Sequence, residues 1–222
     1  MLKVYVTDCG FLKEQPRWEQ KLGLVSEARR KKILSFHSPD DRRRSLAASL
    51  LLRIALGEEH VSYDNVHFSQ GKHGKPLLEG CNLYFNVSHA GECVLCALSD
   101  QQVGADVESL HRFDGKKRGI RHIAGKCLNP QEQELLEQAD QYEETLIGIW
   151  TKKESFVKMT GEGLSRALTT VDTLGENCYE QRILPGDYCA AVCTGKFCGP
   201  GIWQEVRWNV HSQEGYELCM MN

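Results

Sequence analysis

The sequence shows none of the segments that carry a protein out of the cytoplasm or into a membrane. Its first residues, MLKVYVTDCG, lack a basic region followed by an apolar stretch and a small-residue cleavage site. No apolar run approaches the roughly 18 residues that suggest a membrane span. We therefore expect a soluble cytoplasmic protein with no membrane partner.

A large net charge is also missing. The 222 residues carry a formal net charge of −3, which argues against a surface built wholly to bind nucleic acid. Charged residues make up 26% of the chain and hydrophobic residues 41%, the ordinary composition of a soluble globular protein. Local basic clusters could still hold phosphates, so function is expected to reside in short motifs.

Among the ten cysteines, Cys93 and Cys96 have the C-x2-C spacing that occurs in metal sites. Cys93 and Cys96 lie in an expected strand, where residues three apart point to opposite faces. Cys189 and Cys193 share one face, but their small apolar neighbours favour buried free thiols. No metal is assigned to cysteine.

Apolar periodicity and turn residues divide the first half into helices followed by strands. A strand is expected at residues 2–7, a basic helix after an N-cap at Ser26, and a second helix from Asp40 to Leu56. The segments LYFNVSHA, CVLCALS and VGADVE are then expected as strands of one meander.

The second half repeats this order after an exposed linker at residues 109–119. Asn129-Pro130 is typical of a helix start, and a longer helix is expected from Glu143 to Met159, ending at Gly161. Strand-type composition follows in TTVDTL, DYCAAVCTG and VRWNVH. ECVLCALS and DYCAAVCTG are similar cysteine-bearing strands, which favours a two-lobed α+β chain over a continuous parallel sheet.

Asp106 and Glu108 are the strongest local pair of carboxylates. They stand two apart on the expected strand VGADVE, so they project from one face. Two ionised carboxylates side by side repel, and a hard cation such as Mg²⁺, which shares its ligand shell with phosphates, removes that cost. The alternative is a solvated strand edge.

A second motif, WTKKESFVKMTGEGL, places Trp150, Glu154 and Lys158 four residues apart, on one stripe of a helix. The alternative is a surface Glu-Lys pair, worth only about 0.3–0.5 kcal/mol. Trp150 makes a wholly solvated stripe less natural.

Basic residues form two further groups. Residues 29–32 and 42–44 are runs of arginine and lysine, from which one or two side chains of each run could converge on a phosphate. A nucleic-acid patch is the rival, weakened by the lack of interleaved aromatics. GKHGKP and FNVSHA add Lys72, Lys75 and His89, although GKHGKP lacks the spacing of a Walker A loop.

Taken together and in this order, these motifs resemble the Sfp-type 4′-phosphopantetheinyl transferase family. The matching segments are GKP at 74–76, FNVSH at 85–89, VGADVE at 103–108 and WTKKESFVKMTGEGL at 150–164. The resemblance covers residues 25 to 165 most clearly. It implies two similar lobes, each a small, mostly antiparallel sheet packed with helices, with the active site in the cleft between them; we divide the lobes as 1–104 and 105–222.

The resemblance also implies roles for individual residues. Asp106, Glu108 and Glu154 would surround Mg²⁺ and, with Lys158, form the catalytic group. Coenzyme A would be held by a basic and polar set made up of Arg44, Lys75, His89, Ser88, Lys158, Arg29 and Lys32. The expected reaction moves 4′-phosphopantetheine from coenzyme A to a serine of an apo acyl- or peptidyl-carrier protein and releases 3′,5′-ADP.

Some expectations stay open at this level. The cluster Lys116, Lys117, Arg118 and Arg121 could attract an acidic carrier, or could belong to a merely soluble loop. A magnesium-dependent phosphodiesterase acting on coenzyme A or a nucleotide could use the same carboxylates, and a noncatalytic protein that binds coenzyme A or a carrier is the other alternative. A monomer is expected, because two fused lobes can form the cleft within one chain.

Overall fold

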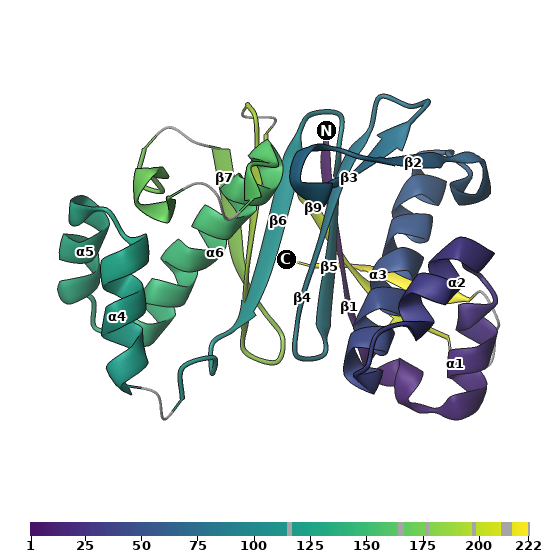
Figure 1. The fold of residues 1–222 in the computed structure, drawn as a ribbon, viewed down its shortest axis with the longest axis horizontal. Coiled ribbons are helices and arrows are strands. Elements are labelled where there is room, and N and C mark those ends of the chain that lie inside the picture. The colour runs from purple at the N-terminus through teal and green to yellow at the C-terminus, as the bar shows by residue number, and fades with distance from the viewer. Residues whose placement is uncertain (115–116, 164–166, 176–177, 197–198, 210–214, 222) are drawn as a thin grey trace.

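The structure is a computed structural model that describes residues 1–114, 117–163, 167–175, 178–196, 199–209 and 215–221. Two β-sheets stand side by side at the centre, with one group of helices on each outer side (Figure 1). The protein is thus α+β, as the sequence predicts.

The first sheet has five strands in the order β10-β9-β1-β5-β4. Their bounds are β1 (Leu2–Asp8), β4 (Tyr84–Ala90), β5 (Cys93–Ser99), β9 (Ile202–Trp208) and β10 (Tyr216–Met220). All neighbours are antiparallel except β1 and β9, which are parallel. Every residue of β5 is buried, because this strand lies inside the sheet and both faces are covered.

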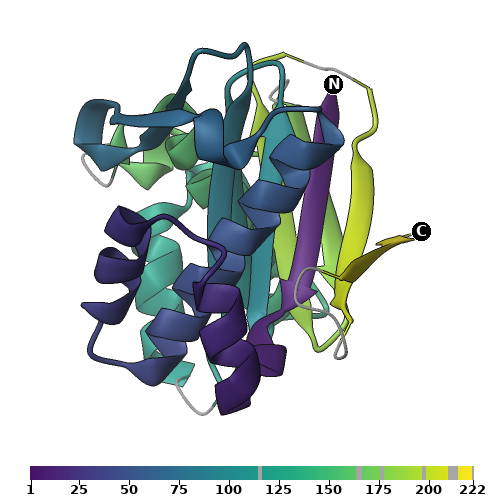
Figure 2. The same ribbon diagram turned by 90° about the vertical axis from the view of Figure 1, so that its right-hand side faces the viewer.

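Three helices cover one face of this sheet (Figure 2). They are α1 (Gln15–Leu22), α2 (Glu27–Leu34) and α3 (Pro39–Glu58). The side-chain hydroxyls of Ser26 and Ser38 cap α2 and α3 by accepting from backbone N–H groups of the first turn. The buried leucines of α3 pack against β5 in one apolar core. A separate hairpin is formed by β2 (His67–Gln70) and β3 (Pro76–Glu79).

The second sheet has three antiparallel strands in the order β6-β8-β7. Their bounds are β6 (Val103–Ser109), β7 (Cys178–Leu184) and β8 (Tyr188–Thr194). The helices on its side are α4 (Lys117–Cys127), α5 (Pro130–Glu137) and α6 (Tyr142–Thr160). Asn129 and Glu132 form a capping box at the start of α5, and Gly161 ends α6 in the left-handed conformation with φ of 70°. Short 3-10 helices occur at Cys9–Lys13, Tyr63–Asn65, Lys72–Gly74 and Leu168–Thr170.

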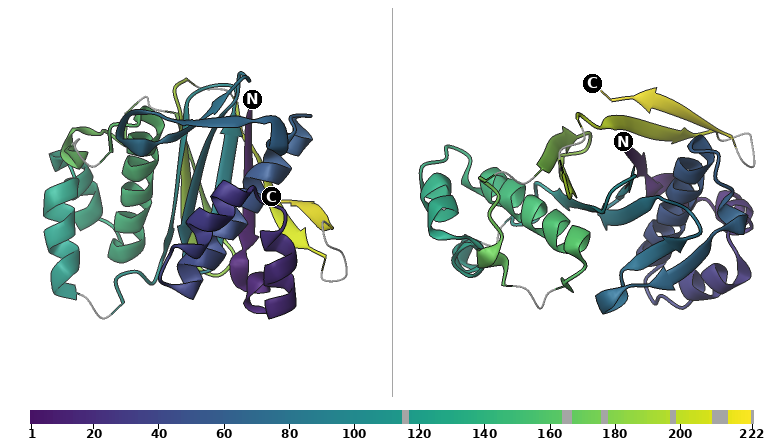
Figure 3. Two further views of the ribbon diagram at one scale, coloured as in Figure 1. Left: turned by 45° about the vertical axis from the view of Figure 1, so that its right-hand side comes forward. Right: turned by 90° about the horizontal axis from the view of Figure 1, so that it is seen from above.

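The two sheets meet where β4 runs beside β6 (Figure 3). β4 and β6 belong to different sheets, and side chains of β4 bond to the backbone of β6. Asn86 Oδ1 accepts from the N–H of Ala105 at 2.8 Å, and Ser88 Oγ accepts from the N–H of Val107 at 3.3 Å. We call this contact the β4–β6 seam. It places Ser88, one of the expected binding residues on β4, beside β6, the strand that carries Asp106 and Glu108.

The expected meander is wrong in one respect. β4 and β5 pair as predicted, but β6 pairs with β8 and joins the second sheet, while the other neighbour of β5 is β1. TTVDTL is also not a strand: its first residues belong to a 3-10 helix, and no strand is assigned to the rest. Both errors have one cause. Strand-like composition does not specify whether a segment pairs with another strand, or with which one, because the partner strand lies far away in sequence.

The two long helices follow the prediction closely, whereas α1, β2, β3 and β10 were not predicted. The helices expected at 40–56 and 143–159 are α3 and α6, and the expected linker at 109–119 gives way to α4 at Lys117. The division into 1–104 and 105–222 stays a prediction. Its boundary falls within β6, and β9 and β10 return from the second half to the first sheet.

The four cysteines singled out by their spacing are buried free thiols. Cys93 and Cys96 contribute to two different apolar clusters, on opposite faces of β5. Cys189 and Cys193 are buried and free. Within the described ranges, every helix is too short or too polar to cross a bilayer.

Candidate functional site

Asp106 lies at the centre of the site, buried on β6. Its Oδ1 accepts from Ser88 Oγ at 3.0 Å and from Lys158 Nζ at 2.6 Å. Its Oδ2 is buried and has no hydrogen-bond partner among the described residues. An unpaired buried carboxylate oxygen is costly, so this atom marks a place that a cation or a donor can fill.

Ser88 links three parts of the site. Its hydroxyl donates to Asp106, and accepts from Lys158 Nζ at 3.0 Å and from the Val107 N–H at 3.3 Å. A hydroxyl has one donor and two acceptor positions, so Ser88 is fully bonded. The residue therefore ties β4, β6 and α6 together around the carboxylate.

Glu108 follows two residues later on β6 and is paired with Arg112. The guanidinium of Arg112 also lies over the ring of Trp150, 5.2 Å from its centroid, and over Phe113 at 5.8 Å. The two carboxylates of the VGADVE motif thus have different cations: Lys158 for Asp106 and Arg112 for Glu108.

Glu154 completes the acidic group from α6. Burial raises the pKa of its carboxyl, and the nearby charge of Asp106 raises it further, while Lys158 and Arg112 act in the opposite direction. A carboxylate with a raised pKa holds a proton more readily than an ordinary glutamate, which suits a group that accepts a proton during a reaction.

A pocket of about 360 Å³ collects these groups. Its lining consists of Val87, Ser88, His89, Asp106, Val107, Glu108, Trp150, Glu154 and Lys158. The structure therefore brings together both carboxylates of β6, the stripe on α6 and the end of β4, as the sequence predicts. The solvated-edge and surface-pair alternatives do not describe these residues.

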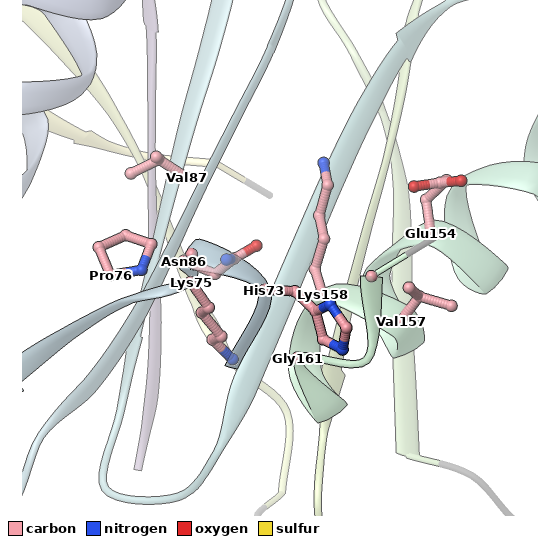
Figure 4. A pocket seen from close by; sticks show the side chains of 11 residues that line it. His73, Lys75, Pro76, Asn86, Val87, Glu154, Val157, Lys158 and Gly161 are labelled. Atoms are coloured by element: carbon pink, nitrogen blue, oxygen red, sulfur yellow. The ribbon is translucent and has the colours of Figure 1, made fainter. Parts of the chain in front are cut away.

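A second pocket of about 300 Å³ shares Val87, Glu154 and Lys158 with the first. Figure 4 shows Glu154 and Lys158 reaching from α6, with Lys75 and Asn86 coming from the opposite half of the chain. Lys75 Nζ donates to the backbone carbonyls of Val103 at 3.0 Å and Met159 at 2.9 Å. Burial lowers the pKa of this ammonium to about 8.

Arg44 on α3 and His89 on β4 both lie near the turn between β4 and β5. Arg44 donates to the carbonyl of Gly91 at 3.1 Å and to Asp41 at 2.5 Å. Desolvation lowers the pKa of the His89 imidazole, and the charges of Arg44 and Lys158 lower it further, although part of the side chain is exposed. The lowered pKa favours the neutral imidazole of His89, so Arg44 is the cation of this pair.

Three expected binding residues line neither pocket: Arg44, Arg29 and Lys32. Arg29 bonds to α3, donating from Nε to Ser49 Oγ at 2.7 Å and from Nη2 to Ser45 Oγ at 3.0 Å. Lys32 is exposed on α2. Their binding roles stay a prediction, because α2 is positioned by α3 and none of the three side chains lines the carboxylate pocket.

The basic group suggested for carrier binding is only partly described. Lys116 lies outside the described residues, as do the side chains of Lys117 and Arg118. Arg121 lies on α4 and lines a pocket of about 240 Å³ with Tyr142. Its role toward a partner stays a prediction.

The described residues contain no group of three or more His, Cys, Asp or Glu side chains already arranged to hold a metal ion. The reason is visible in the contacts: the carboxylates of β6 are engaged by Lys158 and Arg112. The donor chemistry nevertheless fits a hard divalent cation, because Asp106, Glu108 and Glu154 are all oxygen donors in one pocket and Asp106 Oδ2 is unpartnered among the described residues.

Sequence reasoning missed two residues of the site. Arg112 stands four positions after Glu108, but the spacing has no meaning outside a helix, and nothing local predicts that the chain turns back after β6. Asn86 belongs to the FNVSH motif, yet its bond to Ala105 depends on β4 lying beside β6. Only the fold reveals either contact.

Two family models match the chain in consecutive stretches. The model described as "4′-phosphopantetheinyl transferase, N-terminal" matches residues 13–101, and that of the "4′-phosphopantetheinyl transferase superfamily" matches residues 102–198. A solved structure of a Thermotoga maritima holo-[acyl-carrier-protein] synthase covers 53% of this chain and 81% of its own, with a TM-score of 0.35 and 19% identity. An overlay this partial supports no conclusion about the site.

Characterised relatives carry the same description. The chain is 30% identical to the 4′-phosphopantetheinyl transferase Sfp of Bacillus subtilis over 155 residues, which is 68% of this chain and 66% of that protein. It is 32% identical to the 4′-phosphopantetheinyl transferase HetI of a Nostoc species over 139 residues, 59% of this chain and 57% of that protein. The matched region thus spans less than two thirds of the length of each of these relatives. With both family models matched in succession, the chain belongs to the Sfp-type 4′-phosphopantetheinyl transferase family.

Proposed function

We propose that the protein transfers the 4′-phosphopantetheine arm of coenzyme A to a serine hydroxyl of an apo acyl- or peptidyl-carrier protein. The single observation that carries this proposal is the joint pocket formed by Asp106, Glu108, Glu154 and Lys158 beside a group of cations. Carboxylates and cations in one pocket suit a diphosphate that must be both held and attacked.

Different parts of coenzyme A are assigned to the basic side chains and to His89. Lys158 neutralises the diphosphate from the carboxylate side, and Lys75 and His89 hold the nucleotide end from the neighbouring recesses. Arg44 adjoins His89 through the β4–β5 turn and adds a guanidinium for a phosphate. Arg29 and Lys32 on α2 are assigned to assist the same end.

Asp106, Glu108 and Glu154 would hold Mg²⁺, whose oxygen preference matches this set. When bound, the ion would supply positive charge that stabilises the developing charge on the phosphates. The buried, unpartnered Oδ2 of Asp106 supports this assignment.

Glu154 accepts the proton of the carrier serine, directly or through water, and the burial that raises the pKa of its carboxyl favours this role. The serine oxygen forms a new bond to the phosphorus that bears pantetheine. The bond between that phosphorus and the bridging oxygen breaks, and its electron pair leaves with 3′,5′-ADP. Lys158 stabilises the charge on the phosphates throughout, so no covalent enzyme intermediate is required.

The test is to incubate the protein with coenzyme A, Mg²⁺ and a panel of apo-carriers, and then to weigh the carriers by mass spectrometry. Transfer gives a mass gain on a carrier. Release of hydrolysis products without a mass gain identifies a phosphodiesterase, and binding without either product identifies a noncatalytic protein.

Substitutions then test the roles of single residues. Asp106→Ala is expected to abolish metal-dependent transfer, and Glu154→Gln to lower kcat by roughly 10²- to 10⁴-fold, the usual contribution of a general base. Arg44→Ala should mainly raise the KM for coenzyme A. Near-normal transfer by the first two variants would contradict the site.

A further inference from the structure

Arg112 is a cation of the carboxylate pocket that neither the motifs nor the proposed reaction uses. It follows β6 in the loop before α4, and its Nη1 donates to the carboxylate of Glu108. Its charge also acts on Glu154, where it lowers the carboxyl pKa against the effect of burial. One guanidinium therefore serves two of the three carboxylates assigned to the metal.

The two cations of the site are held differently. Lys158 bonds to both Asp106 and Ser88, so it is built into the bonds around the β4–β6 seam. Arg112 is 39% exposed, and besides Glu108 its guanidinium lies over the faces of two aromatic rings. A stacked, partly exposed arginine can turn away from its carboxylate at small cost, because water and the ring faces still accommodate it.

The charges of the pocket make Arg112 and a divalent cation competitors. Three carboxylates share two cationic side chains, Lys158 and Arg112. An ion bound to Glu108 takes the oxygens that Arg112 contacts and repels its guanidinium. Each therefore weakens the binding of the other, by the same factor in both directions.

We propose that the Arg112 guanidinium stays paired with the Glu108 carboxylate until a divalent metal ion displaces it. Arg112 thereby sets how tightly the site binds metal. The inference rests on the metal site of the proposed function. Displacement moves the guanidinium relative to Trp150, since the same side chain makes both contacts. Metal binding is thus coupled to the surroundings of one tryptophan at the edge of the pocket.

The first experiment measures binding of Mn²⁺ alone, from the electron paramagnetic resonance signal of the free ion. Arg112→Gln should bind Mn²⁺ roughly five- to tenfold more tightly than the wild-type protein, because one repelling charge is gone from a partly exposed site. Arg112→Lys keeps the charge and should stay within about twofold of wild type. Arg207→Gln, which breaks an exposed Arg–Glu pair on β9, is the control for net charge and should also change little.

The second experiment follows tryptophan fluorescence, beginning with the wild-type protein. Mg²⁺ titrated into the wild-type protein should alter the tryptophan fluorescence, and Trp150→Phe should remove that response. Arg112→Gln should also lack it while still binding Mn²⁺. Circular dichroism confirms that each variant is folded.

The outcomes separate this inference from the proposed function. Equal or weaker Mn²⁺ binding by Arg112→Gln, or a fluorescence response that persists without Arg112, overturns the inference even if the wild-type protein loads carriers. Tighter binding by Arg112→Gln with no mass gain on any carrier supports the inference and contradicts the proposed function. Absence of metal binding by the wild-type protein overturns the metal site and the inference together.

Discussion

Lys75 is the residue whose charge depends most directly on the fold. Its ammonium is bonded to the carbonyls of Val103 and Met159, and burial lowers its pKa to about 8. Below that pH it is a cation that can attract a phosphate, and above it the amine is neutral. The position between two segments of the chain, not the local sequence GKP, creates this sensitivity.

A pH profile of kcat/KM for coenzyme A tests this residue. Because kcat/KM reports groups of the free enzyme, its value should fall as pH rises through about 8, where Lys75 loses its charge. In Lys75→Arg the charge persists, and the fall near pH 8 should disappear. An identical descending limb in both proteins would assign it to another group.

At the scale of elements, a buried ion pair fixes α6 against α5. Lys153 and Glu132 are both fully buried, 2.6 Å apart. Lys153 also donates to the carbonyls of Leu168 and Val171, while Glu132 accepts from Thr173. Because Glu154 is the next residue on α6, this anchoring helps to orient the stripe of Trp150, Glu154 and Lys158.

Lys153→Met should lower the free energy of unfolding by about 3–5 kcal/mol, because it leaves the charge of Glu132 buried without its cation. Lys31→Met, which breaks the exposed Glu27–Lys31 pair on α2, should cost at most about 1 kcal/mol. Urea unfolding followed by circular dichroism measures both. Equal losses would mean that the buried pair adds no more than a surface pair.

The packing of α6 on β6 requires a residue without a side chain at Gly104. A Cβ built there would lie 1.9 Å from the carbonyl oxygen of Ser155 and 2.2 Å from the backbone N of Met159. Backbone atoms of a helix cannot move aside singly, so α6 would have to shift away from the strand that carries Asp106 and Glu108.

Gly104→Ala should therefore destabilise the protein by about 3 kcal/mol or more, at or beyond the upper end of ordinary overpacking. Gly57→Ala is the matched control, because a Cβ at this position in α3 meets nothing within 4 Å. It should raise stability by about 0.5–1 kcal/mol through helix propensity. A thermal melt of each variant distinguishes the two; a tolerated Gly104→Ala would contradict the close approach.

At the scale of the whole molecule, the two sheets are aligned by side chains of the β4–β6 seam. Asn86 and Ser88 bond to backbone N–H groups of β6, whereas the strands within each sheet are joined by backbone ladders. The pocket lies along this seam and receives residues from both halves. These bonds add directional contacts to the buried apolar cluster that the two sheets share.

Asn86→Ala should cost about 1–3 kcal/mol, because the buried N–H of Ala105 loses its acceptor. Asn82→Ala, at an exposed position before β4, should change stability by less than about 0.5 kcal/mol. Chemical denaturation gives both values. A loss for Asn86→Ala no larger than that of the control would show that the seam does not depend on this bond.

The sequence alone determined the features that depend on neighbours along the chain. The period of two in a strand put Asp106 and Glu108 on one face, the period near four in a helix aligned Trp150, Glu154 and Lys158, and caps set the helix starts. These rules act within a few residues, so they hold before the rest of the chain is placed.

Only the tertiary structure decided which distant segments meet. In the structure, β6 belongs to the second sheet and β9 pairs with β1. Arg29 bonds to Ser49 of α3, and Arg112 forms an ion pair with Glu108. The physical reason is that many strands have a composition that allows several partners, and the choice depends on burying the faces of the whole molecule at once. The motifs identified the residues of the candidate site. The long-range packing decided which side chains contact each of them and how burial shifts their pKa values.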